Sequence, residues 1–290
     1  MTRRIVVPLN GTDRSERALP VAVHLARVTD APLLLISVAY EPASEHPAPV
    51  GYHEHLMERY RDVDATSIVV TSGGSTASAI VAMCRPEDIV CMGVDYTGSV
   101  SEIFLGSVFF ELVRTFHGPV VAVGPHATIP ADADRLLLCI DGLPRALRAL
   151  DLVDAFGDPL RLTPFLVQAV EADPEPTPGW RRPDVVETAY LQGVTAQMRD
   201  IDGNLRTDVG WDVLHGDPAE AIAAAANQPE VAFIGLATDA VDPITRFISP
   251  STANDLLRVS KRPLVLLSST ARVLRSSTMA RAIPAVPGQR

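Results

Sequence analysis

The chain has 290 residues, of which 47% are hydrophobic, and a formal net charge of −10. That length favours two domains, and that hydrophobic fraction is sufficient for a packed core. The negative charge argues against a general nucleic-acid binder, which needs a cationic face, and no apolar run approaches the roughly 20 residues of a membrane helix. We therefore expect neither nucleic acid nor a membrane as a partner.

The start of the chain, MTRRIVVPLN, passes directly into a strand pattern without the apolar run or cleavage site of a signal peptide. Three cysteines, Cys84, Cys91 and Cys139, are too few for a disulfide scaffold and lack the spacing of a metal site. Buried, reduced thiols are their expected state. These features predict a cytoplasmic protein.

Short apolar runs alternate with helical patterns along the first half. Strands are expected near residues 4–9, 33–39, 67–71, 88–94 and 119–123. These runs are almost continuously apolar, as strands covered by helices on both faces must be. The first helix is expected to begin after Asp13 as its N-cap, with Glu16 as the capping-box partner. Pro20 lies inside that helix and is expected to kink it or to lower its stability.

The second half repeats the first. RIVVPLNGTDRSERAL opens the first half, and RLLLCIDGLPRALRAL opens the second. GSTASAI and DIVCMGV are matched by GDPAEAI and EVAFIGL, each 142 residues later, so that Gly93 corresponds to Gly235. Each half then closes with a helix pattern and a final strand pattern, GPVVAVG or RPLVLLS. Five correspondences in the same order indicate a tandem duplication.

The alternation of strands and helices predicts an α/β protein of two tandem, doubly wound, five-stranded parallel sheets with a Rossmann-like architecture. We expect domains at 1–129 and 130–270, followed by a disordered basic tail at 271–290. Each sheet would leave an open edge at its last strand, near 119–123 and 263–268, and an open edge seeks a partner. Pairing of these two edges would give an internal pseudo-dimer.

Ligands of such sheets bind beyond the carboxyl ends of the strands, where the winding direction switches. Two loops of the first half should line that crevice: PLNGTD after the first strand and MGVDYTGSVSEIFLGS after the fourth. The second loop carries Gly93 at its beginning and Gly106-Ser107 at the start of a helix. Backbone N–H groups at a helix start bind phosphate oxygens, and glycine allows a close approach.

These residues resemble the universal stress protein family, specifically its tandem two-domain members. The nucleotide motif of the ATP-binding members is a glycine, two residues, a glycine, nine residues, and then Gly-Ser or Gly-Thr. Gly93, Gly106 and Ser107 match that spacing, with Tyr96 at the middle glycine. The resemblance covers the chain to about residue 270 and implies the fold of that family and ATP as ligand. The acidic side chains Asp95 and Glu102 of the phosphate loop add Mg²⁺ or Mn²⁺ to that expectation. The nucleotide-binding residues that the resemblance implies are Pro8, Asn10, Gly11, Thr12, Val38, Met92, Gly93, Gly106, Ser107 and Val108.

The sequence departs from the family pattern at several of these positions. Asp95 and Glu102 put negative charge in the phosphate loop, which repels a triphosphate unless a divalent cation intervenes. Asn10 replaces the usual aspartate of the first turn. In the second half, Thr238 replaces the middle glycine and Pro250-Ser251 replaces the closing Gly-Ser. Because proline lacks an N–H, no nucleotide is expected there.

The resemblance implies a universal stress protein that binds ATP in its N-terminal domain as a stress sensor or regulator. Two alternatives remain open: a nucleotide-free, stress-related interaction protein of the same fold, and a weak ATPase. No catalytic residue is assigned, because neither a base nor an arginine finger follows the cradle and Ser107, His117 and Asp95 lack a nucleophile-elbow sequence. No metal site is assigned to His46, His53 and His55, since their alternation with glutamates cannot bring all groups to one face. Single-domain relatives dimerise, so a homodimer is also expected.

Overall fold

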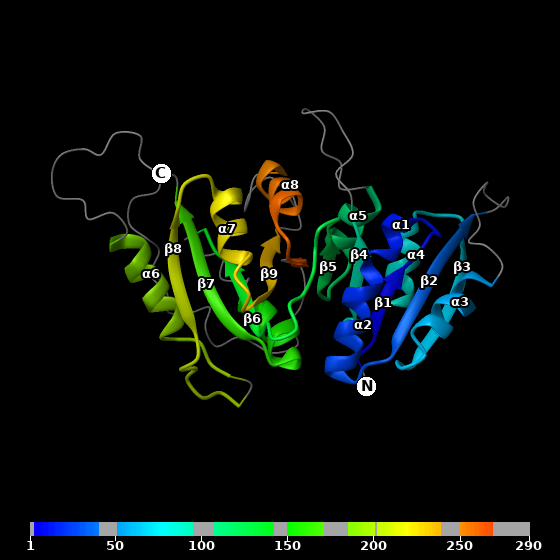
Figure 1. Cartoon of the computed structure of the whole chain (residues 1–290), viewed down its shortest axis with the longest axis horizontal. Coiled ribbons are helices and arrows are strands. Elements are labelled where there is room, and N and C mark those ends of the chain that lie inside the picture. Colours follow the sequence, from blue (N-terminus) through cyan, green and yellow to red (C-terminus); the bar gives the residue numbers. More distant parts are fainter. Residues whose placement is uncertain are drawn as a thin grey trace.

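The computed structural model of the chain describes residues 3–40, 51–94, 107–141, 150–170, 185–200, 202–238 and 250–268. They form one ten-stranded sheet in the order β3-β2-β1-β4-β5-β10-β9-β6-β7-β8, with helices on both faces (Figure 1). Within the described ranges, no helix has the length and apolar character needed to cross a membrane.

The first half supplies one end of the sheet. Its strands are β1 (Ile5–Pro8), β2 (Leu33–Tyr40), β3 (Ala65–Ser72), β4 (Ile89–Gly93) and β5 (Val120–Val123). Its helices are α1 (Asp13–Glu16), α2 (Ala18–Thr29), α3 (Tyr52–Arg59), α4 (Thr76–Met83) and α5 (Ser107–Thr115). All neighbouring strands of this half pair in parallel, so the predicted strands and their parallel arrangement are confirmed.

The second half repeats this arrangement at the other end of the sheet. Its strands are β6 (Arg135–Cys139), β7 (Thr163–Val170), β8 (Gly210–His215), β9 (Val231–Thr238) and β10 (Leu264–Ser268). Its helical segments are the π-helical η2 (Val153–Gly157), the 3₁₀ turn η3 (Asp158–Leu160), α6 (Val185–Thr195), α7 (Pro218–Ala226) and α8 (Pro250–Val259). Its strands also pair in parallel.

The N-caps of α4 and α7 show the duplication at the level of single hydrogen bonds. Ser75 and Asp217 are 142 residues apart, the spacing of the sequence repeat. The Ser75 hydroxyl accepts a bond of 3.1 Å from the N–H of Ser78, and the Asp217 carboxylate accepts one of 3.0 Å from the N–H of Glu220. Both caps satisfy a backbone donor that the first turn of a helix leaves unpaired. The repeat therefore preserves how each helix begins.

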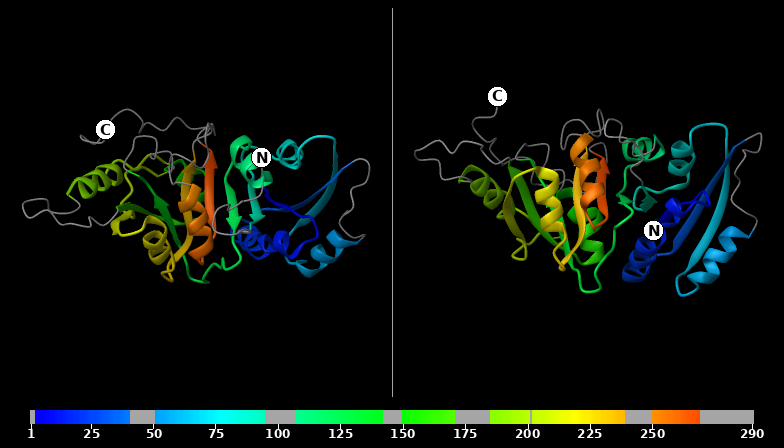
Figure 2. Two further views of the ribbon diagram at one scale, coloured as in Figure 1. Left: turned by 90° about the horizontal axis from the view of Figure 1, so that it is seen from above. Right: turned by 45° about the horizontal axis from the view of Figure 1, so that its top comes forward.

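The two halves join through their last strands. β5 and β10 pair antiparallel, with Val121 opposite Val265 at the middle of the register. This pairing covers the two edges that the sequence predicts to be open, and it merges two parallel sheets into one (Figure 2). The linker adds a hydrogen bond of 2.8 Å from the N–H of Thr128 to the carbonyl of Lys261.

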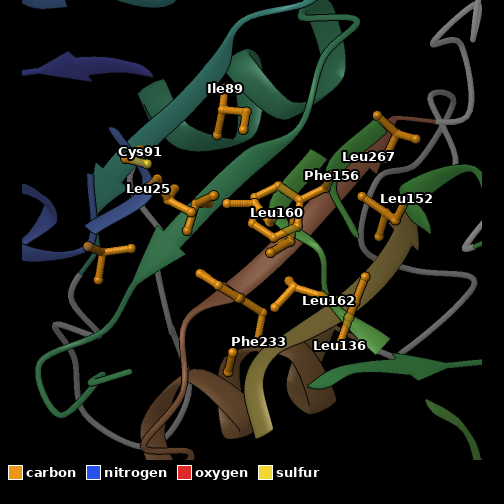
Figure 3. Packing of buried hydrophobic residues seen from close by; sticks show 14 of the residues in the cluster. Leu25, Ile89, Cys91, Leu136, Leu152, Phe156, Leu160, Leu162, Phe233 and Leu267 are labelled. Atoms are coloured by element: carbon orange, nitrogen blue, oxygen red, sulfur yellow. The ribbon is translucent and has the colours of Figure 1, made fainter. Parts of the chain in front are cut away.

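Two layers of buried side chains, one on each face of the sheet, form the core. The layer under α2, α3, η2 and α6 runs across the junction, because residues of both halves belong to it. Figure 3 shows Leu25 of the first half near Phe156 and Leu160 of the second. The rings of Phe156 and Phe233 pack edge to face with their centroids 4.9 Å apart, which is a favoured aromatic geometry. The continuous layer ties the two halves together.

The N-cap of the first helix differs from the expected one, whereas the interruption of the helix agrees with the expectation. Thr12, not Asp13, is the N-cap, because the Thr12 hydroxyl accepts the N–H of Ser15 at 3.4 Å. Glu16 forms no capping box, and its carboxylate accepts the hydroxyl of Tyr52 at 2.9 Å. The helix is interrupted at Arg17, between α1 and α2. Pro20 cannot donate to the carbonyl of Glu16, so the expected disruption by Pro20 is confirmed.

Candidate functional site

The carboxyl ends of three strands of the first half bring apolar side chains to one face of the sheet. Side chains alternate between the faces of a strand. Pro8, Val38 and Met92 therefore share a face with the buried residues two positions before them, which are Val6, Ile36 and Val90. Val38 and Met92 pack against that core layer, and so does Val108 of α5. The structure thus places four of the expected residues on the α4 and α5 side of this edge.

The first turn contributes polar atoms that hydrogen-bond to one another. Gly11 has a φ of 77°, in the left-handed region that favours glycine. The side-chain oxygen of Asn10 accepts the N–H of Thr12 at 3.3 Å and its hydroxyl at 2.7 Å. These bonds form a local turn that aspartate would also support. All three residues are exposed, so a ligand at this edge can reach them.

Gly93 has a packing reason to be glycine. A Cβ at this position would collide with the carbonyl oxygen of Arg14 and would lie 3.0 Å from its carbonyl carbon. The backbone of α1 thus rests directly on the end of β4. Since Met92 faces the α4 and α5 side, Gly93 faces the opposite one. The close approach of α1 accounts for this glycine of the motif without a ligand.

Helix α5 begins at the same edge of the sheet. Ser107 is its first residue, and Val108 is half-buried. The helix is held against the start of α4, because Glu111 accepts the hydroxyls of Ser75 at 2.6 Å and Ser78 at 3.3 Å. The rest of the phosphate loop, residues 95–106, lies outside the described residues. It includes the expected ligand Gly106.

The equivalent glycine of the second half is packed by side chains instead of backbone. A Cβ on Gly235 would lie 2.7 Å from Cδ2 of Leu138 and 3.2 Å from Cδ1 of Leu152. Helix α8 begins at Pro250, which has no N–H to offer. The duplication therefore preserves the fold but not the surroundings of this position.

The described residues of the two groups for which no catalytic or metal site is expected lie apart in the structure. Ser107 is the first residue of α5, and His117 follows its end at Thr115, so about 13 Å of helix separates them. His53 is buried and His55 is exposed, while His46 lies outside the described residues. No group of three or more His, Cys, Asp or Glu side chains suited to a metal occurs in the described part of the chain.

A polar cluster beneath the first turn was not predicted from the sequence. The hydroxyl of Ser37 donates to the carbonyl of Leu9 at 2.8 Å and lies 2.9 Å from Nε2 of His53. Because that hydroxyl proton is committed to Leu9, Nε2 of His53 is the donor to Ser37. Both side chains are buried. Together with the bond between Tyr52 and Glu16, they tie α3 to the end of β1 and to α1.

One signal could have located this cluster. His53 and Leu56 are three residues apart, which puts them on the same face of a helix, and both are buried in α3.

Burial also raises the pKa of Tyr52 far above its usual value, with a further contribution from its hydrogen bond to Glu16. Tyr52 therefore stays protonated and keeps donating to that carboxylate.

The buried His53 predicts a loss of stability in mild acid. Desolvation lowers its pKa below the ordinary value, against an opposing effect of Glu54. An unfolded histidine titrates near pH 6.5, so the unfolded chain binds this proton first. The stability that neutral His53 provides is thus complete above about pH 6.5 and is lost as the pH falls through the folded pKa.

Urea unfolding at about pH 7.5 and about pH 5 measures this effect. His53→Gln, which keeps an N–H donor for Ser37, is expected to lose less stability between the two pH values than the wild type. Half-buried His24 has a lowered pKa, caused by desolvation and by Arg27, so part of the pH dependence should remain. His117→Gln at an exposed position should behave as the wild type. Equal pH dependence in His53→Gln and the wild type would contradict the assignment.

Comparison with known proteins gives the same family on both halves. The model of the universal stress protein family matches residues 1–124 and 133–268. A universal stress protein from Archaeoglobus fulgidus superposes with a TM-score of 0.61 at 16% identity, over 91% of this chain and 98% of that chain. A putative universal stress protein from Pseudomonas aeruginosa has a TM-score of 0.57 at 16% identity, over 92% and 93% of the two chains. The comparison with curated proteins finds no match.

Proposed function

Because this chain belongs to the universal stress protein family, we propose that it binds an adenine nucleotide, ATP, in its N-terminal half and acts as a stress sensor or regulator. The observation that supports this most is the convergence of Pro8, Val38 and Met92 on one face, beside the start of α5. An adenine ring needs apolar walls, and its phosphates need the N–H groups of a helix start. Both lie at one edge of the first half.

A divalent cation is part of this proposal. The phosphate loop contains Asp95 and Glu102 and no lysine or arginine between Val94 and Leu105. Carboxylates repel the phosphates of ATP unless a cation lies between them. Mg²⁺ prefers oxygen ligands and binds through carboxylates together with substrate phosphates. ATP is therefore expected to bind with Mg²⁺ or Mn²⁺, and with modest affinity.

The second half is proposed to bind no nucleotide. Pro250 removes one N–H from the start of α8. One ATP per chain is the expected stoichiometry.

Isothermal calorimetry of the full chain with ATP and Mg²⁺ tests the proposal. Ser107→Asp adds a negative charge at the start of α5, where an acidic side chain suits the helix but repels phosphate. We expect one equivalent per chain in the wild type, and affinity roughly tenfold lower in Ser107→Asp. Ser251→Asp, the same change at the corresponding position of α8, is the control and should bind as the wild type.

Variants of the phosphate loop follow from the sequence motif. Gly106→Val should abolish binding, because the side chain fills the space that the phosphate needs. Tyr96→Gly combined with Asp95→Arg restores the family pattern and should raise the affinity. Pro250→Gly alone should create no second site. Two equivalents per chain, or unchanged affinity in Ser107→Asp and Gly106→Val, would place the ligand elsewhere.

The same samples separate the two alternative functions. Absence of binding heat at all ATP concentrations would favour the nucleotide-free interaction protein. Phosphate release above background in the presence of Mg²⁺ would favour the weak ATPase.

A further inference from the structure

Strand β3 forms one end of the ten-stranded sheet and has a single neighbour, β2 (Figure 1). Its sequence is ATSIVVTS, which contains no charged residue and no proline. Natural proteins protect edge strands with charges, prolines or bulges, because an open edge pairs with another strand. β3 has eight residues and carries neither charge nor proline.

The register shows which backbone groups of β3 point away from the sheet. The N–H of Leu33 donates to the carbonyl of Asp64 at 2.8 Å, while Leu33 is aligned with Ala65. In a parallel ladder, successive residues point alternately toward and away from the neighbour. The N–H and C=O groups that point outward are therefore those of Ala65, Ser67, Val69 and Thr71. Within the described part of the chain, these outward groups have no hydrogen-bond partner.

The opposite end of the sheet is protected. The N–H of Gly216 donates to the carbonyl of Val170 at 3.1 Å, so by the same alternation the outward residues of β8 include Val213. The N–H of Val213 already donates a hydrogen bond of 2.9 Å to the carboxylate of the preceding residue, Asp212. An incoming strand at this edge would meet a negative charge and an occupied donor. The two ends of the sheet thus differ in whether they can accept another strand.

β3 is complementary to a second, antiparallel copy of itself when Val69 lies at the centre of the pairing. Val69 is 60% exposed, the largest value among the exposed large hydrophobic residues of the described part. If two antiparallel copies meet with Val69 opposite Val69, each valine exchanges both N–H···O=C bonds with its copy. The same alignment puts Ser67 opposite Thr71. No like charges meet in this register, and β-branched side chains stack across the strands.

We propose that β3 pairs antiparallel with β3 of a second copy about a two-fold axis at Val69, which extends the sheet across two molecules. A second copy is favoured because the strand complements itself and because the chain already joins two sheets by antiparallel edge pairing at β5 and β10. Such an isologous contact closes after two molecules. It leaves only the protected β8 edges at the ends of the combined sheet. The contact is independent of nucleotide binding.

Sedimentation velocity and light scattering of the full chain over a range of concentrations test this contact. The wild type is expected to form a dimer of the 31.1 kDa chain. Val69→Lys sets two positive charges opposite each other and should raise the dimer dissociation constant at least roughly tenfold. Val69→Pro removes the central N–H and should have a similar effect. Val28→Lys, at an exposed valine of α2, is the matched control and should dimerise as the wild type.

Cross-linking locates the axis. Residues opposite each other in a hydrogen-bonded antiparallel pair have Cα atoms about 5.5 Å apart, within the range of a disulfide. Under mild oxidation, Val69→Cys should give a covalent dimer and Val28→Cys should not. Circular dichroism checks that the variants keep the native fold. A wild type that stays at 31.1 kDa at every concentration, or a dimer that Val69→Lys and Val69→Pro leave unchanged, would overturn the proposal.

Discussion

Asp88→Ala is expected to lower the free energy of unfolding by about 3 kcal/mol, because it leaves Arg4 without its buried partner. The Asp88 side chain is fully buried, and its carboxylate lies 2.6 Å from Nη2 of Arg4. It also accepts the backbone N–H groups of Arg4 at 3.0 Å and Arg85 at 2.9 Å. In the alanine variant the mostly buried Arg4 side chain would lose its carboxylate partner and keep the bond of 2.9 Å from Nη2 to the carbonyl of Met83. The two backbone donors would be left unpaired, and each such loss is costly.

Urea unfolding measures this change, and a second ion pair of the same half provides the control. Arg27 and Asp62 are 2.7 Å apart, but both side chains are more than half exposed. Solvent screens such a pair, so Asp62→Ala should change the free energy of unfolding by less than about 1 kcal/mol. Similar losses in Asp88→Ala and Asp62→Ala would show that burial does not determine the strength of these pairs.

The ion pair of Arg4 with Asp88 could have been predicted from the sequence repeat. Arg4 and Arg135 both stand immediately before the first apolar run of their halves, and Asp88 and Glu230 both stand before the fourth. In the second half, Arg135 and Glu230 form the corresponding pair at 3.0 Å, with both side chains about one third exposed. An opposite-charge pair that recurs at the starts of two neighbouring parallel strands predicts a contact. The difference in burial between the two pairs depends on packing and was not predictable.

The fold was predictable because burial on both faces leaves a clear mark on the sequence. Apolar runs such as those at 33–39 and 88–94 can only be central strands, and the structure confirms them. The pairing of β5 with β10 followed from the open edge of each half. The N-cap was wrong by one residue, because Thr12 and Asp13 are both good caps. The side chain of Asn10 forms a turn with Thr12 that favours Thr12 as the cap. Residue types alone do not predict this turn.

The candidate site was only partly predictable, for a similar reason. Alternation along the strands places Pro8, Val38 and Met92 on one face, and that follows from the strand assignment. The bond between Ser37 and His53 joins residues 16 positions apart that no local pattern connects. Gly93 shows the limit of a motif. Its spacing indicates a phosphate site, whereas its close contact with the Arg14 backbone becomes visible only in three dimensions.

Gly93→Ala is therefore expected to destabilise the fold by about 3 kcal/mol, at the upper end of the cost of an overpacked core. Its Cβ would collide with the carbonyl oxygen of Arg14, and the Arg14 backbone has little freedom to move. The turn before it is held by the Thr12 cap, and the N–H of Arg17 donates to the carbonyl of Asp13 at 3.1 Å. Strand β4 cannot retreat either, since β1 and β5 flank it.

Gly73→Ala is the matched control, because a Cβ there meets no atom within 4 Å. It should leave the free energy of unfolding unchanged or raise it by about 0.4–1 kcal/mol, since alanine restricts the unfolded chain. Thermal and urea unfolding of the two variants measure the difference. If Gly93→Ala proves as stable as Gly73→Ala and yet loses ATP binding, then Gly93 serves the ligand and not the packing of α1. If Gly93→Ala is destabilised as expected, its loss of binding says nothing about the phosphate site, and Ser107→Asp becomes the variant that decides whether ATP binds there.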